Sequence, residues 1–549
     1  MKPKTPKTSP VKIESTGRNL DKKSHLGDPF NAASKVTATI IVKRRTDTVP
    51  IKTLDQFQQE DLLQRKILSH DEFRDIHGAA QADVDLVVKF ANDNNLDVLD
   101  NNLARRSVVV RGSVAQINKA FGIALHQVAT HQDRKSYSGF VHLPASVANV
   151  VEHIIGLDDQ PVHAKHYTAN PPDTTSLTPQ QVAKLYNFPT GDGAGQTIGI
   201  YEMKIGNESP GYNLIDIGQT LAGFGGGLSV PSLTAVPVDG QANTNISDGE
   251  TLLDITVSGA IAQKANIAVY FTGDTTQNMV HALQAMIHPG AGDPVPTILS
   301  ISYGWGPDDD TQIMSPADYG LLSTLFQDAA QMGITVLVSS GDSGPSLSQG
   351  YKYAQASYPA SDPWVLACGG TTIGDITAGS FAEYVWNNPP TDGATGGGVS
   401  AFFAVPPYQN GIAIPKRNAP KGNVGRGLPD VAGNAGPASG YTLYLRGQAQ
   451  QTGGTSAVAP LYAGLIAVVN SLLGGNKAGF LNPSLYKLGN QVCRDIASPP
   501  GPANNNYNGV KGYPCVKGWD ACTGLGAIDG GKLLTALQAA LAAPAAQPV

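Results

Sequence analysis

The sequence predicts an α/β protein in which a domain with a parallel sheet follows a smaller domain with an antiparallel sheet. In the back part of the chain, short and nearly continuous apolar runs alternate with helix-like stretches, as expected of parallel strands covered on both faces. In the front part, alternating β-branched segments are separated by short helix-like stretches. With 549 residues the chain is long enough for more than one hydrophobic core.

The composition is that of a globular, turn-rich chain. Only 15% of the residues are charged, and there are 62 glycines and 38 prolines, which suits a loop-rich enzyme better than a disordered or coiled protein. No signature of nucleic-acid binding appears, no apolar run approaches the length of a membrane span, and the amino-terminal residues lack the apolar core of a secretory signal. We therefore expect no nucleic-acid partner and no membrane span.

Charge divides unevenly along the chain. Residues 1–172 carry 23 Lys and Arg against 19 Asp and Glu, a net +4, whereas residues 173–549 carry 15 against 25, a net −10. Unequal halves are common and need no function. The alternative is that the two parts attract each other near neutral pH, and that this attraction weakens once carboxylates take up protons.

The first domain is expected to span residues 35–161, after a polar tail, residues 1–34, that is expected to be disordered. Its elements are predicted from apolar periodicity. The predicted strands are residues 36–43, 107–112 and 123–128, and the predicted helices are residues 82–95, 113–121 and 145–155. This alternation indicates a small α/β domain with an antiparallel sheet.

A Pro- and Thr-rich stretch, residues 162–178, predicts an extended and accessible linker. The second domain is expected to span residues 179–549 and to begin with a helix over residues 177–186. Catalytic loops are expected at the carboxyl ends of its parallel strands. These strands include residues 197–201, 267–271, 297–302 and 335–338.

The most informative stretch is Gly-Gly-Thr-Ser-Ala-Val-Ala-Pro, residues 453–460, which runs into the apolar segment 461–469. Glycines permit a tight turn, so the hydroxyl of Ser456 is predicted to lie on the first turn of a buried helix, where unpaired N–H groups favour anionic character. Pro460 is tolerated there because the first turn needs no donor. The alternative is a Gly/Ser loop that caps a core helix.

A serine nucleophile needs a base, and histidines are scarce in the part of the chain that contains Ser456. Nine of the eleven histidines precede residue 167, which leaves His281 and His288, both in or just after a helix-like run. Neither lies in a Gly-flanked motif, and both are interpreted as satisfied surface histidines. The base is therefore predicted to be a carboxylate, and carboxylate bases work best in acid.

Two carboxylates are predicted to share one helix face. Asp248 has the character of an N-cap, and Glu250 and Asp254 follow at i, i+4 spacing. Like charges at this spacing raise one pKa and favour a shared proton. The alternative is two solvated carboxylates on an exposed face, although the apolar neighbours at 252, 253, 255 and 257 predict a mostly buried helix.

A further carboxylate, Asp342, follows the apolar run 336–338 in a Gly-Asp-Ser-Gly turn, at the carboxyl end of a predicted strand. One interpretation is an Asp that caps the turn. The other is an oxyanion partner, because a carboxylic acid that stays protonated can donate a hydrogen bond to a tetrahedral intermediate.

Together these residues resemble the active site of the sedolisin (serine-carboxyl peptidase) family, and the likeness to its kumamolisin-like members extends over nearly the whole chain. The resemblance implies Ser456 as the nucleophile, Glu250 as the base and Asp254 as the residue that orients Glu250. It also implies Asp342 as the donor in the oxyanion hole.

Beyond these four residues the resemblance is less complete. Glu202, after the apolar run 198–201, corresponds to a glutamate that extends the catalytic network in kumamolisin-like enzymes. Tyr303 follows Ile-Ser where those enzymes have Trp, which leaves the outer part of the network open, although Tyr303 could also form a hydrogen bond. The front domain resembles their activation domain, including Ala-Gln-Ile-Asn-Lys-Ala-Phe-Gly at 115–122 and Ile-Ile-Gly-Leu-Asp at 154–158.

This resemblance implies a subtilisin-like catalytic domain preceded by a ferredoxin-like pro domain. The implied activity is that of a self-activating acid endopeptidase that acts on proteins and peptides. The pro domain would serve as intramolecular inhibitor and chaperone, maturation would cut the linker, and the enzyme would be an extracellular monomer.

A structural Ca²⁺ is implied near the C-terminus by the same resemblance. Two Asp residues with backbone carbonyls suit a hard cation, although their spacing alone is weak evidence. Ile496, Val516 and Gly518 would contribute backbone oxygen. The implied ligands are Asp495, Ile496, Val516, Gly518 and Asp520.

The four cysteines lack the spacing of a zinc site. Cys368 and Cys522 lie among small residues and are interpreted as buried small hydrophobes. Cys493 and Cys515 could form one disulfide, a question that the sequence leaves open.

Three alternatives to this assignment stay open. A subtilisin-type Ser-His-Asp peptidase would need His281 or His288 as base and a neutral to alkaline optimum. A non-catalytic binding protein would keep the fold but would show no covalent labelling of Ser456. A tripeptidyl-peptidase of the same family would need a blocked subsite that the sequence does not reveal.

Overall fold

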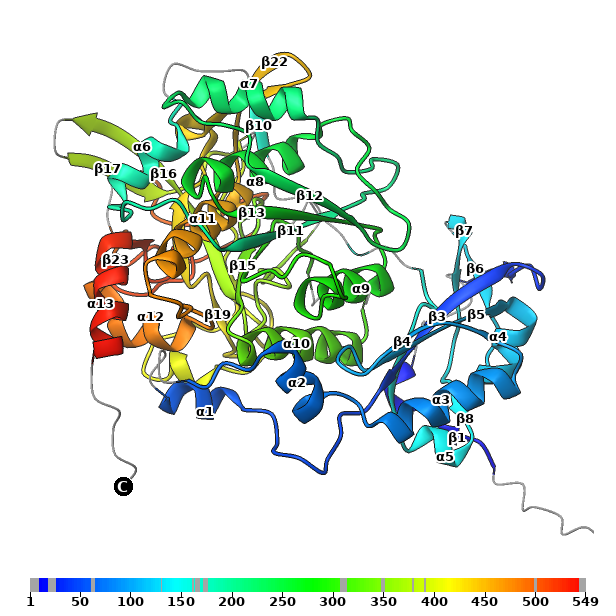
Figure 1. The fold of residues 1–549 in the computed structure, drawn as a ribbon. Helices are drawn as coiled ribbons and strands as arrows, with labels where there is room; N and C mark the ends of the chain where they lie inside the picture. Colours follow the sequence, from blue (N-terminus) through cyan, green and yellow to red (C-terminus); the bar gives the residue numbers. More distant parts are fainter. Residues whose placement is uncertain are drawn as a thin grey trace, which may run out of the picture.

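The structure is a computed structural model that describes residues 9–17, 26–60, 65–129, 131–159, 162, 168–170, 176–306, 314–346, 351–377, 380–389, 392–497 and 501–542. It has two parts that lie side by side in Figure 1, an amino-terminal domain drawn mostly in blue and cyan and a larger domain drawn mostly in green to red. None of the helices in these ranges is long and apolar enough to cross a membrane.

The amino-terminal domain is built on a four-stranded antiparallel sheet, as predicted. Helices α3 (Gln81–Asp93) and α4 (Val114–Phe121) pack on this sheet and enclose one apolar core. Ser113 begins α4 with a capping box, and Gly122, at φ 64°, ends it in the left-handed conformation. The strand order is β4 (Asp97–Asn102), β5 (Ser107–Ser113), β3 (Lys35–Val42) and β9 (Val151–Ile155).

The prediction of one helix over residues 145–155 is wrong. The helix α5 (Ala145–Ala148) is a single turn, and the rest of this stretch contains strand β9. β9 is rich in β-branched residues and pairs with β3, so its buried side chains complete the edge of the core.

The tail at residues 1–34 is not wholly disordered, contrary to expectation. Within its described residues, β1 (Val11–Lys12) pairs with β8 (His142–Leu143), and β2 (Leu26–Pro29) pairs with β6 (His126–Val128). Ile13 lies in the core of the domain. Polar composition did not reveal these strands because their partners, β8 and β6, lie far away in the sequence.

The larger domain is built on an eight-stranded sheet in which each neighbouring pair is parallel except the pair β16–β17. The strands expected from the four apolar runs are all present. The order is β12 (Ser232–Pro237), β13 (Asn266–Thr272), β11 (Thr197–Met203), β14 (Ile298–Ile301), β15 (Thr335–Ser339), β16 (Leu366–Thr377) and β17 (Ser380–Val385), with β20 (Val431–Asn434) paired to β16.

Helices cover both faces of this sheet. On one face, α8 (Gly249–Ile261) and α11 (Val458–Ser471) pack against each other and against the strands. On the other face lie α9 (Thr276–Ile287) and α10 (Pro316–Gln331). Successive side chains of β11 (Thr197–Met203) alternate between the two cores, as the pleat of a strand requires.

Shorter elements complete the two domains. The remaining helices are α1 (Leu54–Gln59), α2 (His70–His77), α6 (Pro179–Leu185), α7 (Leu214–Phe224), α12 (Asn482–Leu488) and α13 (Gly530–Ala542). The remaining strands are β7 (His131–Ser136), β10 (Thr168–Asn170), β18 (Gly398–Val399), β19 (Gly427–Leu428), β21 (Tyr441–Leu445), β22 (Gln448–Gly453), β23 (Cys493–Arg494) and β24 (Ala527–Ile528).

The amino-terminal domain contacts the larger domain at α9 and α10. His153 Nε2 lies 2.8 Å from Asp318 Oδ1, and Arg44 is paired with Asp328. Both of these carboxylates are buried. Arg105 Nε donates to the backbone oxygen of His288 at 2.9 Å. The basic front part and the acidic back part therefore meet through specific side-chain pairs.

His281 and His288 are not surface histidines, contrary to expectation. His281 Nε2 lies 2.7 Å from Thr39 Oγ1 of the amino-terminal domain, and its Nδ1 lies 2.7 Å from Asp239 Oδ1. His288 is 3% exposed, with Nε2 3.1 Å from Asp328 Oδ2. The docked domain covers this side of α9, and the sequence of α9 alone could not reveal that cover.

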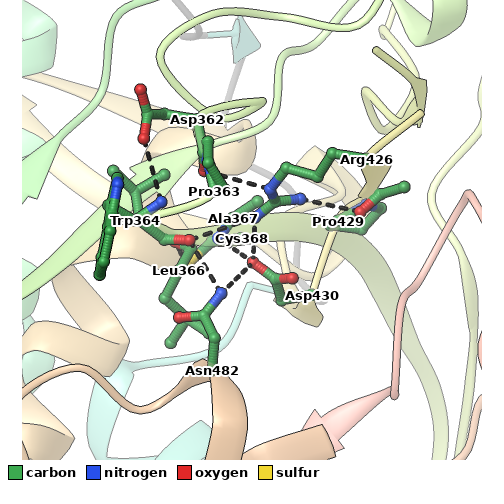
Figure 2. Close-up of polar contacts among 12 residues, drawn as sticks. Asp362, Pro363, Trp364, Leu366, Ala367, Cys368, Arg426, Pro429, Asp430 and Asn482 are labelled. Atoms are coloured by element: carbon green, nitrogen blue, oxygen red, sulfur yellow. Dashed lines mark hydrogen bonds and ion pairs between the residues drawn. The ribbon is translucent and has the colours of Figure 1, made fainter. Parts of the chain in front are cut away.

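A buried ion pair anchors the segment that leads into β20. Arg426 and Asp430 are fully buried, and Arg426 Nη2 lies 2.7 Å from Asp430 Oδ2. Figure 2 shows that Arg426 also reaches backbone oxygens, while Asn482 of α12 and the backbone N–H of Ala367 in β16 donate to the same carboxylate. Because the paired charges are also hydrogen-bonded, this cluster ties β16, β20 and α12 together.

Candidate active site

Ser456 lies in a tight turn between a strand and a buried helix. β22 ends at Gly453, and Gly454 has φ 113°, a conformation that side chains disfavour. A 3-10 turn, η6 (Thr455–Ala457), then leads into α11. Ser456 is fully buried, and its Oγ donates to the backbone oxygen of Ser302 at 3.4 Å. The sequence predicted that Ser456 lies on the first turn of the helix. In the structure Ser456 lies in the short 3-10 turn that precedes α11.

Glu250 and Asp254 lie on α8, and Asp248 is the N-cap of this helix, as predicted. The Asp248 carboxylate accepts the backbone N–H groups of Glu250 at 3.0 Å and of Thr251 at 3.1 Å. Glu250 is 1% exposed and Asp254 is 0% exposed, so they are not solvated carboxylates on an open face. Helix α8 packs against the turn η6, which brings the helix with both carboxylates against the turn with Ser456.

The environment of this helix favours protonated carboxyl groups. Burial, and then the neighbouring Glu250, raise the pKa of Asp254 well above its usual range. Burial also raises the pKa of Glu202 on β11 well above its usual range. The Tyr303 hydroxyl donates to Glu202 Oε2 at 2.7 Å, and the Ser302 hydroxyl donates to Asp254 Oδ2 at 2.8 Å. Tyr303 therefore makes the hydrogen bond that the sequence left open.

Asp342 follows β15 and contacts the residue before Ser456. Its Oδ1 accepts both the backbone N–H and the hydroxyl of Thr455, each at 2.8 Å. Burial raises the pKa of Asp342 to about 7, so the group is protonated in acid. Its Oδ2 is buried and has no hydrogen-bond partner among the described residues. A protonated Asp342 can therefore donate to a reacting group beside Ser456.

The parallel sheet explains why residues distant in sequence meet here. β11, β14 and β15 are neighbours in the sheet, and their carboxyl-terminal ends carry Glu202, Ser302 and Asp342. Ser302 and Thr455 also belong to the site, although no sequence pattern described above indicated them. Ser302 follows a predicted strand as Asp342 does, and Thr455 precedes Ser456 within the informative motif, so position alone could have indicated both.

The C-terminal residues expected to bind calcium lie close together. Asp495 Oδ2 accepts the backbone N–H of Gly518 at 2.8 Å, and Asp520 Oδ2 accepts that of Val516 at 3.0 Å. Asp495 Oδ1 is buried and lacks a hydrogen-bond partner among the described residues. No cluster of three or more His, Cys, Asp or Glu suited to a metal occurs in the described ranges, so the site would depend on two carboxylates and on carbonyl oxygens.

Cys493 and Cys515 do not form the disulfide that the sequence left open. Cys493 and Cys515 are both free, and the Cys515 thiol is directed at the backbone oxygen of Ile496. Cys368 and Cys522 are free and fully buried, as predicted.

Comparisons with known proteins agree with this geometry. The family model "Pro-kumamolisin, activation domain" matches residues 22–160. The chain is 37% identical to kumamolisin of Bacillus sp. strain MN-32, over 93% of each chain. It is 30% identical to tripeptidyl-peptidase sed5 of Aspergillus fumigatus, over 91% of this chain and 92% of that protein. Pseudomonas sedolisin, a serine-carboxyl proteinase, superposes with a TM-score of 0.54 at 26% identity, over 67% of this chain and 99% of that chain.

The fold and the site define a serine-type peptidase with a subtilisin-like parallel sheet and an amino-terminal activation domain. The chain belongs to the sedolisin family of serine-carboxyl peptidases.

Removal of the Ser302 hydroxyl is expected to lower kcat about tenfold, because Asp254 would lose its hydrogen-bond donor. The variant Ser302→Ala keeps the backbone oxygen that faces Ser456. Ser300→Ala is a matched control, since Ser300 is buried two residues earlier and its hydroxyl has no partner among the described residues. Steady-state kinetics at acid pH would compare the two variants, and equal losses would contradict a specific role of Ser302.

Proposed function

We propose that the chain is the precursor of an acid endopeptidase that hydrolyses peptide bonds of proteins through an acyl-enzyme at Ser456. The observation that carries this proposal is the set of buried carboxyl groups that surrounds the turn of Ser456. The two histidines of the larger domain are engaged on the opposite face of the sheet, at the contact with the activation domain.

In the proposed reaction, Ser456 Oγ attacks the carbonyl carbon of the scissile bond while Glu250 accepts its proton as general base. Asp254, held protonated by burial, donates toward Glu250 and orients it, and the Ser302 hydroxyl holds Asp254 in place. Asp342 donates from Oδ2 to the oxyanion of the tetrahedral intermediate. The proton on Glu250 then passes to the leaving amine, and water enters by the reverse steps to release the acid product.

The linker supports a role of the same site in self-processing. β10 (Thr168–Asn170), which lies in the expected linker, pairs antiparallel with β22, with Thr168 opposite Gly453. Gly453 precedes Ser456 by three residues, so β10 pairs with the strand that leads directly into the turn of the nucleophile. We therefore propose that this site cuts the maturation bond in the linker, residues 162–178. Residues 163–167 and 171–175, part of the linker that was expected to be accessible, lie outside the described residues.

Conversion of the precursor is expected to require acid. Burial lowers the pKa of His288. The docked precursor therefore has the full stability that a neutral His288 allows at pH values above the ordinary histidine pKa, and it loses this stability as the pH falls below that pKa. Burial alone would raise the pKa of Asp328, but Arg44 and His288 outweigh it and hold this pKa below its usual range, so its contribution is lost at still lower pH. Both pKa shifts predict that the activation domain binds the larger domain more weakly in acid.

The measurement is the intact mass of purified precursor held at about pH 7 and at about pH 4. We expect a stable chain near neutral pH and, below about pH 5, a fragment that begins within residues 165–180. Ser456→Ala precursor, the control, should stay intact at both values. Equal conversion at both pH values, or a cut well inside residues 36–156, would contradict the charge argument.

A tripeptidyl-peptidase is the second candidate function, because tripeptidyl-peptidase sed5 is among the similar proteins. The two candidates differ in their products. An endopeptidase releases fragments of many lengths from an amino-terminally blocked peptide, whereas a tripeptidyl-peptidase requires a free amino terminus and releases tripeptides. Mass analysis of a library of blocked and unblocked peptides distinguishes them.

We further propose that one Ca²⁺ stabilises the C-terminal part, with Asp495, Asp520 and the backbone oxygens of Ile496, Val516 and Gly518 as ligands. The buried and unsatisfied Asp495 Oδ1 supports this proposal. The ion would hold the loop that these residues form and take no part in the chemistry. We also propose that the enzyme is an extracellular monomer. Its pro domain would act as intramolecular inhibitor and chaperone.

Exhaustive chelation is expected to lower the melting temperature by about 5 °C or more, because an ion that binds only the folded state stabilises it. Thermal unfolding followed by circular dichroism measures the shift. Asp495→Asn is the control, since a variant that has lost the ion should melt lower and respond little to chelator. An unchanged melting temperature of the chelated wild-type chain would contradict the proposed calcium site.

A further inference from the structure

Thr455 holds Asp342 through two donors on the same oxygen. Its backbone N–H and its hydroxyl both point at Asp342 Oδ1, each at 2.8 Å. The Thr455 hydroxyl in turn accepts the backbone N–H of Gly341 at 3.0 Å, so its single proton is left for Asp342. The three groups form one directed chain that ends at Oδ1.

This chain decides which oxygen of a protonated Asp342 can carry the proton. A proton on Oδ1 would face a backbone N–H that can only donate. A proton on Oδ2 leaves both lone pairs of Oδ1 for the two donors. Oδ2 is buried and accepts no hydrogen bond from any described residue, so a proton there stays available for a substrate.

We propose that the Thr455 hydroxyl is a positioning group that fixes the acidic proton of Asp342 on Oδ2, aimed at the developing oxyanion. The proposal rests on the proposed role of Asp342 as oxyanion donor and goes beyond it. Without the hydroxyl, a share of the enzyme would hold the proton on Oδ1, directed away from the reacting carbonyl. Thr455 therefore acts through Asp342 and not on the substrate.

The hydroxyl has a second, separable effect on Asp342. Burial raises the pKa of Asp342, whereas the hydrogen bonds from Thr455 lower it. Asp342 must be protonated to donate, so activity is lost as pH rises through its pKa. Removal of the hydroxyl should therefore lower the maximal rate and at the same time move the basic limb of the pH profile upward. A merely structural loss would lower the rate without this upward movement.

The test uses mature enzyme prepared from Thr455→Val precursor, which keeps the shape and the backbone N–H of Thr455. We expect kcat to fall about tenfold, as for the loss of one hydrogen bond, with KM nearly unchanged and the basic limb moved to higher pH. Thr455→Ser restores a hydroxyl and should recover most of the rate. Thr372→Val is the matched control, because Thr372 is buried and its hydroxyl has no partner among the described residues.

Asp342→Asn distinguishes an effect on the position of the acidic proton from a general effect on the structure. The amide of an asparagine has its donor and its acceptor on different atoms, so they exchange places only if the buried side chain rotates, which would turn the NH2 group toward the backbone N–H of Thr455. Thr455→Val in this background should therefore cost much less than tenfold. An equal cost in both backgrounds, or a basic limb that stays in place, would overturn the proposal. If Asp342→Ala is inactive while Thr455→Val is fully active, the role of Thr455 fails and the peptidase mechanism stands. If Asp342→Ala is fully active, the oxyanion role itself fails.

Discussion

Ser456→Ala is expected to abolish peptide cleavage and conversion of the precursor together. Ser456 lies in the turn η6, fully buried between the helix that carries Glu250 and the strand end that carries Asp342. No backbone change is required, because alanine fits the 3-10 turn as serine does. The expected loss is at least about four orders of magnitude in kcat/KM, as for removal of a nucleophile from a catalytic triad. Cleavage of a quenched fluorescent peptide and the intact mass of the chain measure both effects.

The control for this variant is its fold. Ser456→Ala should melt within about 2 °C of the wild-type precursor, because only one weak hydrogen bond, to the backbone oxygen of Ser302 at 3.4 Å, is lost. A pure Ser456→Ala chain that still converts itself would exclude Ser456 as nucleophile. A variant that does not fold is recognised by its melting curve, and Ser456→Cys then serves as the second test.

Glu250→Gln and Asp254→Asn are expected to lower kcat/KM by several orders of magnitude, about 10⁴-fold for Glu250→Gln. Glutamine cannot accept the proton of Ser456. Asparagine keeps the hydrogen bond from Ser302 but offers an amide in place of the protonated carboxyl group that orients Glu250. Steady-state kinetics on mature enzyme across acid pH would measure both losses.

His281 and His288 provide the opposite arm of this prediction. Both contact the activation domain or its ion pairs, so their variants must be compared after that domain has been removed. Under this condition His281→Ala and His288→Ala should keep nearly full activity. An inactive histidine variant beside an active Glu250→Gln variant would favour a Ser-His-Asp peptidase.

Local patterns in the sequence predict the parts of the site that depend on single elements. The spacing of Glu250 and Asp254 indicates one helix face, and the apolar runs before Glu202 and Asp342 indicate strand ends at one edge of a parallel sheet. Their burial and proximity then follow from the fold.

Features that depend on contacts between distant segments could not be predicted in this way. The strand β9 and the paired strands of the tail depend on partners in other parts of the chain. His288 is buried by a different domain. The position of Thr455 beside Ser456 is visible in the sequence, but its proposed role depends on which groups donate and accept in its hydrogen bonds with Asp342 and Gly341. The sequence does not specify these hydrogen bonds.

The pH dependence of kcat/KM of the mature enzyme tests the central claim, that carboxyl groups and no histidine activate Ser456. Asp342, whose pKa burial raises to about 7, must hold its proton to donate, and Glu250 must have lost its own. Activity is therefore expected to be maximal in acid and to disappear as pH rises through about 7. Activity that increases through pH 7 to an alkaline plateau, as a histidine base would give, would contradict it.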